Sequence, residues 1–518
     1  MLDTRGPEIT VTKPPELEIA LVAGQTLVLT TDTSVPPSAS QLPVSYERLP
    51  AILSPGDSIF LGQYLFTGSE TSSVYLRVVS TDARTVTCEA RNSATLGGLM
   101  LTVHLENVLT GIPSLPPHDV DAIRGWGARN SIDFLSLSFT QSGAEVAAAR
   151  ALLDACGLSD TLIMAKVENR EGLCHIDEIA DAADGIILSR GNLGVDLPPE
   201  KLFKVQKLAV MTCADRGKPC VITRVLDSMT DAPRPTRAEA TDVANAVLDG
   251  CDGFLLGAET LRGAFPVETV RVVLSIAHEA ERVFNATRYY KQLNARDGGP
   301  TKEYSHVESL ASSAVRAAEK VAARLIIVFT QTGRAARLVA KYRPTVPILS
   351  VVVPRLRTDA GLHWRFTGLA QARQALIVRG LIPVLADPAD SFSGMRALSG
   401  EEFSRYGGGM LGKVVHRAGG MGLVAPGDRV VVVQRLGDTA VVKVLEYTGN
   451  ATLPQVTSTA EFGGHAHVGS SGALAGSAYA GGSGYVASAA HALAPHGSGL
   501  QLHFPRHSSA GSSISEEE

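Results

Sequence analysis

The sequence predicts an α/β fold: a (β/α) barrel that carries an inserted small β-barrel domain and is followed by a C-terminal α/β domain. Two observations lead to this prediction. Between residues 134 and 260, five short apolar runs alternate with stretches of helical periodicity. Before them, residues 8–113 contain short alternating stretches separated by Gly, Pro, Asp and Asn. The first pattern is typical of parallel strands joined by helices, and the second of a small antiparallel barrel or sandwich.

The composition limits the possible classes of protein. The chain has 518 residues, enough for roughly two to four domains, and 45% of them are hydrophobic. A net charge of -5 and an aromatic content of 5% argue against a nucleic-acid partner. None of the six cysteines has CxxC spacing, and scattered free thiols indicate a reducing compartment. No apolar run reaches the length of a membrane span, and no secretory signal or transit peptide is visible, so we expect a cytoplasmic protein without membrane contact.

The predicted elements follow one another in a simple order. The inserted domain is built on the stretches TLVLTT, YLFTG, VYLRVVS, TVTCEA and LMLTVHL. Barrel strands are expected at 134–139, 161–168, 185–191, 220–225 and 253–258, each followed by a helix. In the last domain, an amphipathic helix over 305–323 precedes a strand, turn and helix over 325–342. Its further strands are expected in VPILSVVVP, ALIVRGLIPVLAD, RVVVVQRL and VVKVLEY.

The tail has a different composition. It is rich in Gly, Ser, Ala and His and ends in three glutamates, Glu516–Glu518. Such a segment cannot bury enough apolar surface to offset its chain entropy, so we expect it to be disordered. The irregular spacing of its histidines favours a solvated linker over a metal site.

Polar residues gather where the predicted barrel strands end, which is where the chemistry of such barrels takes place. Lys166 and Glu168 are two residues apart and share one face of a strand, although alone they would fit a structural ion pair equally well. Thr236 and Glu239 are best explained as a helix capping box. The other strand ends are hard to explain by core packing alone and favour a functional site; they carry Ser138, Arg190, Gly191, Asn192, Thr223, Arg224 and Glu259.

Several long motifs then give a more specific interpretation. LDTRGPEI, MAKVENREG, DGIILSRGNLGVDLPPEK, RPTRAEATDVANAVLDG and GAETLRGAFPVE together resemble pyruvate kinase over about residues 1–448. Sequence segments such as SRGNLG and VITRVLDSMTD are similar to those of the plant-type cytosolic branch of that family. The resemblance implies a glycolytic enzyme that transfers the phosphoryl group of phosphoenolpyruvate to ADP, giving pyruvate and ATP, with Mg²⁺ and K⁺ as cofactors. It also implies a homo-oligomer, which is a tetramer in the family.

The resemblance assigns roles in catalysis and substrate binding to matching residues. Lys166 matches the lysine beside the transferred phosphoryl group and the enolate. Thr223 matches the threonine near the face on which the enolate is protonated. Arg190 and Gly191 match a turn whose backbone binds the substrate carboxylate, and Asn192, Thr223 and Ser138 are counted with them as substrate-binding residues.

Two positions match the magnesium site of the family. Glu168 matches a carboxylate ligand, and Asn192 stands where most members have an aspartate. An amide oxygen is still a hard ligand, but it brings no charge. We therefore expect a variant site that binds magnesium more weakly than an aspartate site would.

A potassium site is implied at the start of the chain. Asp3 and Thr4 match potassium ligands, and Ser138 lies at the edge of that site. Glu8 matches the acidic residue that marks potassium-dependent members.

One departure concerns the first barrel strands. LDTRGPEI matches the third barrel strand of the family, so the first two βα units, with residues that serve ADP and potassium, are missing from this sequence. We expect an open barrel with exposed strand edges and an incomplete gene model whose first Met is internal. The expected domains are 1–7 (start of the barrel, third strand), 8–113 (small β-barrel), 114–290 (rest of the barrel), 291–448 (α/β domain) and 449–518 (tail).

Regulation and two rival functions remain open. Thr330, Thr332, Gly333 and Arg334 form a strand-turn-helix pattern suited to a phosphate, but the effector loop of the family has no counterpart, so activation by fructose 1,6-bisphosphate is not predicted. One rival is another magnesium-dependent barrel enzyme acting on phosphoenolpyruvate or an oxoacid. The other is a catalytically impaired or regulatory pyruvate kinase-like subunit, motivated by the missing strands.

Overall fold

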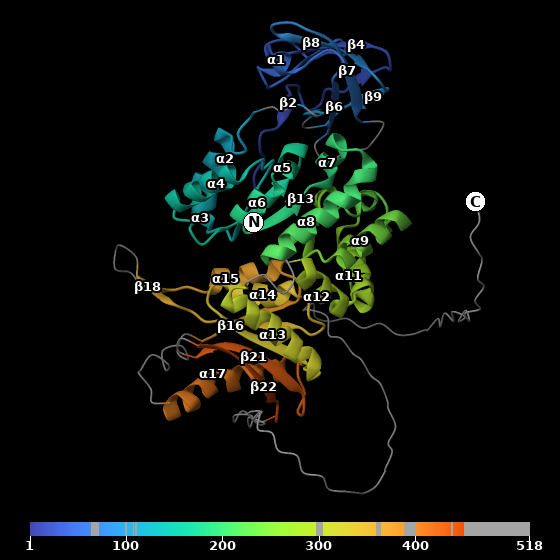
Figure 1. Cartoon of the computed structure of the whole chain (residues 1–518). Helices are drawn as coiled ribbons and strands as arrows, with labels where there is room; N and C mark the ends of the chain where they lie inside the picture. Colours follow the sequence, from blue (N-terminus) through green and yellow to red (C-terminus); the bar gives the residue numbers. More distant parts are fainter. Residues whose placement is uncertain are drawn as a thin grey trace, which may run out of the picture. The chain divides into compact units, whose positions relative to one another are not determined.

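The computed structural model describes residues 1–63, 72–98, 101–106, 108, 111–296, 304–358, 364–387, 400–436 and 439–449. The predicted tail lies outside the described residues from residue 450 on, as do the whole predicted stretch YLFTG and the first two residues of LMLTVHL. Figure 1 shows three structured parts in chain order: a small β domain, a sheet with surrounding helices, and a second α/β part.

A six-stranded parallel sheet forms the part predicted as a (β/α) barrel. Its strand order is β1-β11-β12-β13-β14-β15, and every neighbouring pair is parallel. The strands are β1 (Leu2–Asp3), β11 (Phe134–Leu137), β12 (Leu162–Val167), β13 (Gly185–Leu188), β14 (Cys220–Thr223) and β15 (Gly253–Leu255). Within the described residues, β1 and β15 each have one neighbour, so the sheet is open on both sides and the prediction of six strands is confirmed.

Helices connect these strands and cover one face of the sheet. A segment of α2 (Pro117–Ala122), a π-helical turn (Ile123–Gly127) and α3 (Ala128–Asn130) leads into β11. The later connections are α4 (Gly143–Ala155), α5 (Arg170–Cys174), α6 (Ile176–Ala182), α7 (Arg190–Asp196), α8 (Leu202–Arg216), α9 (Arg237–Asp249), α10 (Ala258–Leu261) and α11 (Pro266–Val283). Short 3₁₀ turns at Pro199–Lys201 and Asp227–Thr230 precede α8 and α9.

The alternation of side chains along β12 decides which residues face the helices. Ile163, Ala165 and Val167 belong to the large apolar core between the sheet and the helices. Met164 belongs to a smaller apolar cluster with Ile187 and Val221. Because successive side chains of a strand point to opposite faces, Lys166 shares the face of Met164 and points away from the helices.

The inserted domain has its own core and a sheet of order β2-β10-β6-β7-β8-β4-β5. Alternating buried and exposed residues along β7 and β8 give one apolar face, as the sequence pattern predicts. The β4–β5 pair is parallel, so the domain is not wholly antiparallel. The elements are β2 (Ile9–Val11), β3 (Ile19–Leu21), β4 (Thr26–Thr30), β5 (Gln41–Pro43), α1 (Leu49–Ile52), β6 (Ser58–Gln63), β7 (Val74–Thr81), β8 (Thr85–Ala90), β9 (Ala94–Leu96) and β10 (Leu101–Leu105).

The C-terminal part is a five-stranded sheet of order β20-β17-β16-β21-β22, with an apolar core on each face. One core includes residues of α13 and α14, and the other includes residues of α17. The helices are α12 (Ala286–Arg296), α13 (His306–Lys320), α14 (Arg334–Lys341), α15 (Leu369–Gln374) and α17 (Gly400–Gly420). The strands are β16 (Leu325–Thr330), β17 (Ile348–Val352), β20 (Leu381–Leu385), β21 (Arg429–Leu436) and β22 (Thr439–Glu446), with a separate hairpin of β18 (Leu356–Thr358) and β19 (Trp364–Phe366).

Two local predictions were wrong and one is confirmed. Arg190 and Gly191, expected in a turn, begin the short helix α7; neither glycine of α7 has a positive φ, so the left-handed backbone of a glycine turn is not used. The start of ALIVRGLIPVLAD is a 3₁₀ turn, Ala375–Ile377, because the strand begins only at Leu381. The capping box of Thr236 and Glu239 is confirmed, with both reciprocal hydrogen bonds present.

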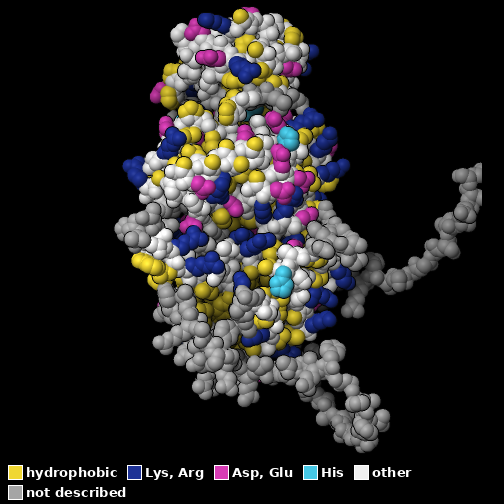
Figure 2. Space-filling view, turned by 60° about the vertical axis from the view of Figure 1, so that its left-hand side comes forward, with side chains coloured by type: hydrophobic (Ala, Val, Ile, Leu, Met, Phe, Trp, Pro, Cys, Tyr) yellow, Lys and Arg dark blue, Asp and Glu magenta, His cyan; other side chains and the backbone are white. Residues whose placement is uncertain are grey.

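The surface carries charges of both signs. On the face drawn in Figure 2, Lys and Arg side chains are interspersed with Asp and Glu side chains over the helices around the parallel sheet.

A buried ion pair joins the parallel sheet to the C-terminal part. Arg343 donates from Nη1 and Nη2 to the two carboxylate oxygens of Asp252, both at 2.9 Å, and to the carbonyl of Gly250 at 2.7 Å. The same carboxylate accepts the backbone N–H groups of Cys220 and Arg379. Both side chains are buried, so Asp252 depends on Arg343 for its charge balance.

We expect Arg343→Met to lower the free energy of unfolding by about 3–5 kcal/mol, because the Asp252 carboxylate would stay buried without its cation. Urea unfolding followed by circular dichroism measures the loss. The control is Arg282→Met, which removes an exposed pair with Glu279 and should change the stability by less than about 1 kcal/mol. Equal losses in the two variants would contradict the importance of this ion pair.

Candidate active site at the ends of the parallel strands

The ammonium group of Lys166 lies at the centre of the candidate site. The residue is 5% exposed and comes from the inner face of β12. Its Nζ lies 3.0 Å from the Ser138 hydroxyl oxygen, 3.2 Å from a carboxylate oxygen of Asp3 and 3.4 Å from one of Glu168. These partners come from the ends of three neighbouring strands, β11, β1 and β12. The ion pair of Lys166 with Glu168 is the one that their spacing in the sequence suggests. The structure adds Asp3 and Ser138, which are far from Lys166 in the sequence.

Glu168 and Asn192 form the second element of the site. The Asn192 side-chain amide donates a hydrogen bond of 2.5 Å to Oε2 of Glu168, and the backbone N–H of Phe139 donates to Oε1 at 3.2 Å. Because the nitrogen of the Asn192 amide is used toward Glu168, its carbonyl oxygen remains as the ligand atom. Two hard oxygen donors of this kind are the type that magnesium prefers.

Asp3, Thr4 and Ser138 are held together by the pairing of β1 with β11. The Thr4 hydroxyl donates to the Ser136 carbonyl at 3.1 Å and accepts the Ser138 N–H at 2.9 Å. The Ser138 hydroxyl donates to the Thr4 carbonyl at 2.6 Å. The resulting cluster of hydroxyl, carbonyl and carboxylate oxygens matches the donors that a potassium ion needs.

Glu8 is the least satisfied group near the site. Its side chain is 1% exposed, and neither carboxylate oxygen has a hydrogen-bond partner among the described residues; the Arg5 Nε lies 3.9 Å away. Burial, together with the charge of Glu168, raises the pKa of Glu8 to about 8. A buried carboxylate that lacks hydrogen-bond donors among the described residues fits a place where a positive charge is to be bound.

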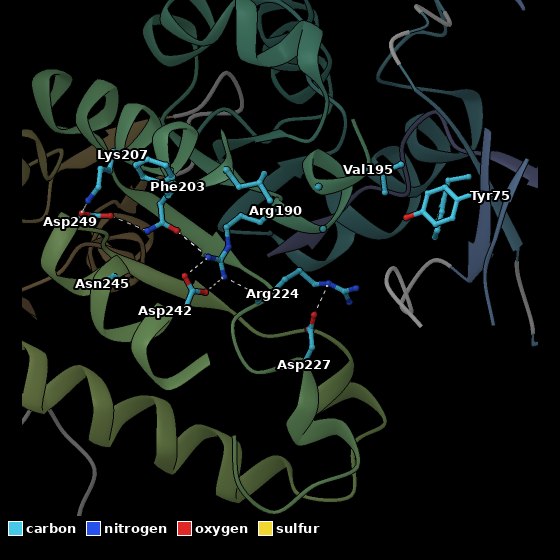
Figure 3. Close-up of a pocket in the computed structure, with 15 residues that line it drawn as sticks. Tyr75, Arg190, Val195, Phe203, Lys207, Arg224, Asp227, Asp242, Asn245 and Asp249 are labelled. Carbon is cyan, nitrogen blue, oxygen red and sulfur yellow. Dashed lines mark hydrogen bonds and ion pairs between the residues drawn. The ribbon is translucent and has the colours of Figure 1, made fainter. Parts of the chain in front are cut away.

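Arg190 does not point toward these residues. Its guanidinium donates to the backbone carbonyls of Thr223 at 3.0 Å and Arg224 at 2.6 Å, and to the side chains of Gln206 and Asp242. Figure 3 shows the side chain directed toward Asp242. The sequence-based expectation that the backbone of this segment binds substrate is compatible with this position, because Gly191 lies in the first turn of α7, where N–H groups lack intrahelical acceptors.

Thr223 ends β14, and the next residue has an unusual backbone. Thr223 is buried and its hydroxyl donates to the Leu188 carbonyl at 3.4 Å. Arg224 has a φ of 60°, the left-handed region that a non-glycine residue rarely adopts. The bonds from Arg190 hold this strained segment in place, so Arg190 acts on Thr223 through the backbone.

Two cavities adjoin the site. One of about 420 Å³ is lined by Glu8, Glu168 and Asn192 among others. The other, of about 810 Å³, is lined by Arg190, Gly191 and Arg224 among others, and Figure 3 shows this second cavity. Both volumes are within the range of small-molecule sites.

Three site-related residues could not be assigned from the sequence. Gln206 and Asp242 hold Arg190, and Asp119 binds the segment after β1. Only Asp119 lies in a recognisable sequence pattern: it belongs to the first turn of a helix that begins at Pro117, directly after Pro116. Glu259, expected at a strand end, lies in α10; it is fully buried, one oxygen accepts the Gly257 N–H at 3.0 Å, and burial raises its pKa.

Two family models and several relatives match the sequence of this chain. Residues 1–270 match the model of the pyruvate kinase barrel domain, and residues 308–445 match that of the pyruvate kinase alpha/beta domain. Pyruvate kinase 2, cytosolic, from Oryza sativa is 52% identical over 447 residues, which are 86% of this chain and 82% of the relative. The cytosolic isozyme from Glycine max is 40% identical over 86% of this chain and 83% of its own length.

A solved structure shows the same fold. A crystal structure of a pyruvate kinase from Cryptosporidium parvum superimposes with a TM-score of 0.72 at 31% identity, covering 86% of this chain and 83% of that chain. The parallel sheet, whose strand ends carry Lys166, Glu168 and Thr223, lies within residues 1–270, which match the barrel-domain model. On the combined evidence of motifs, fold and relatives, the chain belongs to the pyruvate kinase family.

Proposed function

We propose that the phosphoryl transfer from phosphoenolpyruvate to ADP takes place around the Lys166 ammonium. The observation that carries this proposal is the position of a buried lysine within 3.4 Å of oxygens from Asp3, Ser138 and Glu168. Phosphoryl transfer depends on positioning and charge neutralisation. Lys166 would neutralise charge on the transferred group and on the pyruvate enolate, where a fixed cation in a water-poor site is most effective.

Glu168 and Asn192 would hold magnesium. No group of three or more His, Cys, Asp or Glu side chains arranged for a metal occurs in the described part of the chain, so substrate oxygens and water would complete the six ligands. When bound, the ion supplies positive charge to phosphoryl and enolate oxygens. The two protein ligands contribute one negative charge in place of the two that an aspartate at position 192 would give.

Asp3, Thr4 and Ser138 would hold potassium, with Glu8 as the nearby anionic group. The buried carboxylate of Glu8, which has no hydrogen-bond partner among the described residues, supports this assignment, because ionising it in a buried place requires nearby positive charge.

The remaining roles concern the substrate. The Gly191 backbone would bind the carboxylate of phosphoenolpyruvate, and Thr223 would lie at the face on which the enolate receives its proton. Arg190 would keep the Thr223–Arg224 segment in position through its two carbonyl contacts.

We further infer a cytosolic location from relatives whose names describe cytosolic isozymes, and a homo-oligomer, which is a tetramer in the family, from the family match. Within the described residues, the helices include none long and apolar enough to cross a membrane. Among the described residues β1 and β15 each have one strand neighbour, and an unpaired strand edge can pair with another chain; this supports one second candidate, a catalytically impaired or regulatory subunit.

Measuring pyruvate formation from phosphoenolpyruvate and ADP tests the proposed reaction. With magnesium, we expect turnover that potassium stimulates more than lithium. Lys166→Met should lower kcat by at least about 10²–10³, the loss seen when one charge-stabilising donor is removed. Lys320→Met, which alters an exposed lysine, is the control. Binding of phosphoenolpyruvate without turnover in the parent chain would favour the regulatory subunit.

The protonation state of Glu8 can be tested through the pH dependence of the free energy of unfolding. Without bound cations, folded Glu8 keeps its proton up to about pH 8, whereas the unfolded residue loses it near 4.5. Between these values the folded state binds more protons, so stability falls as pH rises. Glu8→Gln should remove this contribution, which is about 1.4 kcal/mol for each unit of pKa difference.

Urea unfolding in chelator and without potassium, at several values between pH 5 and 8.5, measures this slope. Glu16→Gln changes an exposed glutamate of the small domain and should keep the slope of the parent. If the free energy of unfolding falls with pH equally in Glu8→Gln and in the parent, Glu8 does not titrate as described.

The magnesium assignment predicts a gain for Asn192→Asp. A second carboxylate beside Glu168 should lower the magnesium concentration for half-saturation by about tenfold, because calcium- and magnesium-type sites are tuned by ligand charge. The same carboxylate would face Glu168 in the metal-free protein and lower its melting temperature. Thermal unfolding as a function of magnesium concentration measures both effects.

Asn285→Asp is the matched control, because Asn285 accepts the Arg288 N–H at an exposed position and an aspartate accepts it equally well. An unchanged magnesium dependence in Asn192→Asp would remove Asn192 from the ligand set.

A further inference from the structure

The small β domain is connected to the parallel sheet by two linkers. The chain leaves β1 at Asp3 and enters the domain at β2, which begins at Ile9. It leaves the domain after β10, which ends at Leu105, and returns to the sheet through α2, which begins at Pro117. A movement of the domain relative to the sheet therefore requires a change in the backbone of these two linkers.

Asp119 of α2 binds the outgoing linker. It is 4% exposed, and each of its carboxylate oxygens accepts one backbone N–H: Oδ1 from Arg5 at 3.0 Å and Oδ2 from Gly6 at 2.8 Å. His118 Nε2 lies 3.6 Å from Oδ2. Because Asp119 belongs to the end of the return linker, one side chain ties both linkers together.

The bound linker passes very close to the candidate active site. Gly6 has a φ of 78°, and a Cβ at this position would lie 2.8 Å from the Cβ of Ser138. Ser138 donates to the Thr4 carbonyl and accepts from Lys166. The two hydrogen bonds of Asp119 therefore fix the backbone directly after Asp3 and Thr4 and two residues before Glu8.

The return linker has a second attachment. Glu145 of α4 accepts the Ser114 N–H at 3.3 Å with Oε1 and the Gln141 N–H at 2.7 Å with Oε2. Gln141 follows Phe139, whose N–H binds Glu168. Carboxylates thus hold the outgoing linker to α2 and the return linker to the loop that follows β11.

From these contacts we infer that Asp119 is a positioning residue of the reaction: it holds the Arg5–Gly6 backbone so that Asp3, Thr4 and Glu8 keep the arrangement of the potassium site. This inference rests on the proposed function for the role of that site. Asp119 lies behind the linker and acts only through backbone N–H groups.

Asp119→Asn tests the inference. An asparagine has one acceptor oxygen, and its NH₂ group faces one of the two N–H donors, so one hydrogen bond is lost without a change of size. We expect amide hydrogen exchange at Arg5 and Gly6 to rise at least about tenfold, as local opening of a segment predicts. The potassium concentration for half-maximal activity should rise several-fold, with a smaller change in kcat.

Asp121→Asn is the matched control, because Asp121 is exposed on the same helix two residues later. Asp119→Glu, which keeps two acceptor oxygens, should recover part of the protection at Gly6. Potassium-dependent thermal stabilisation of the same variants gives a readout that needs no turnover.

The inference is overturned if exchange at residues 3–8 and the potassium dependence of Asp119→Asn equal those of Asp121→Asn. It is also overturned if Asp119→Asn speeds exchange evenly over the whole chain and leaves the potassium dependence unchanged, because Asp119 would then serve stability alone. An inactive parent chain would reject the proposed function, while the exchange and thermal data would still decide whether Asp119 holds the linker.

Discussion

The buried ammonium of Lys166 is the interaction on which the arrangement of the site depends. A charged group in an apolar interior must be met by oxygens, and these oxygens come from β1, the end of β11 and the end of β12. The register that aligns Leu2 with Leu135 and Ser136 with Met164 is therefore a condition for satisfying this charge. A slip of one residue along β12 would turn Lys166 into the apolar core beneath the helices.

The charges around Lys166 explain why the site suits additional cations. Asp3, Glu168 and Glu8 are carboxylates gathered near one ammonium, and Glu8 has a pKa of about 8 in the absence of further positive charge. Asn192 reduces this excess, because its amide donates to Glu168 where a carboxylate would repel it. The local balance of charge thus links the identity of residue 192 to the need for metal ions.

The sequence could predict those parts of the site that depend on local spacing. Lys166 and Glu168 are two residues apart at the end of an apolar strand, so the sequence indicates that they lie on one face at a strand end. In the structure, Lys166 Nζ lies 3.4 Å from Oε1 of Glu168. The direction of the Arg190 side chain could not be predicted, because it depends on Gln206 and Asp242 of helices that pack beside it. The two bonds of Asp119 join residues more than 110 positions apart, and no spacing rule reports such a contact. The short helix α7 was missed because its glycines favour a turn in isolation, whereas packing of Leu193 into the core stabilises the helical form.

The insertion of the small domain between β1 and β11 has a consequence for folding. Thr4 and Ser136, which are hydrogen-bonded neighbours, are 132 residues apart in the chain. Closing a flexible loop of that length costs about 4 kcal/mol of chain entropy. The inserted domain has a separate apolar core, so it can form before β1 pairs with β11 and bring the two ends of the insertion near each other. The order of assembly therefore matters: a non-local strand pair becomes a nearly local one once the domain between its partners has folded.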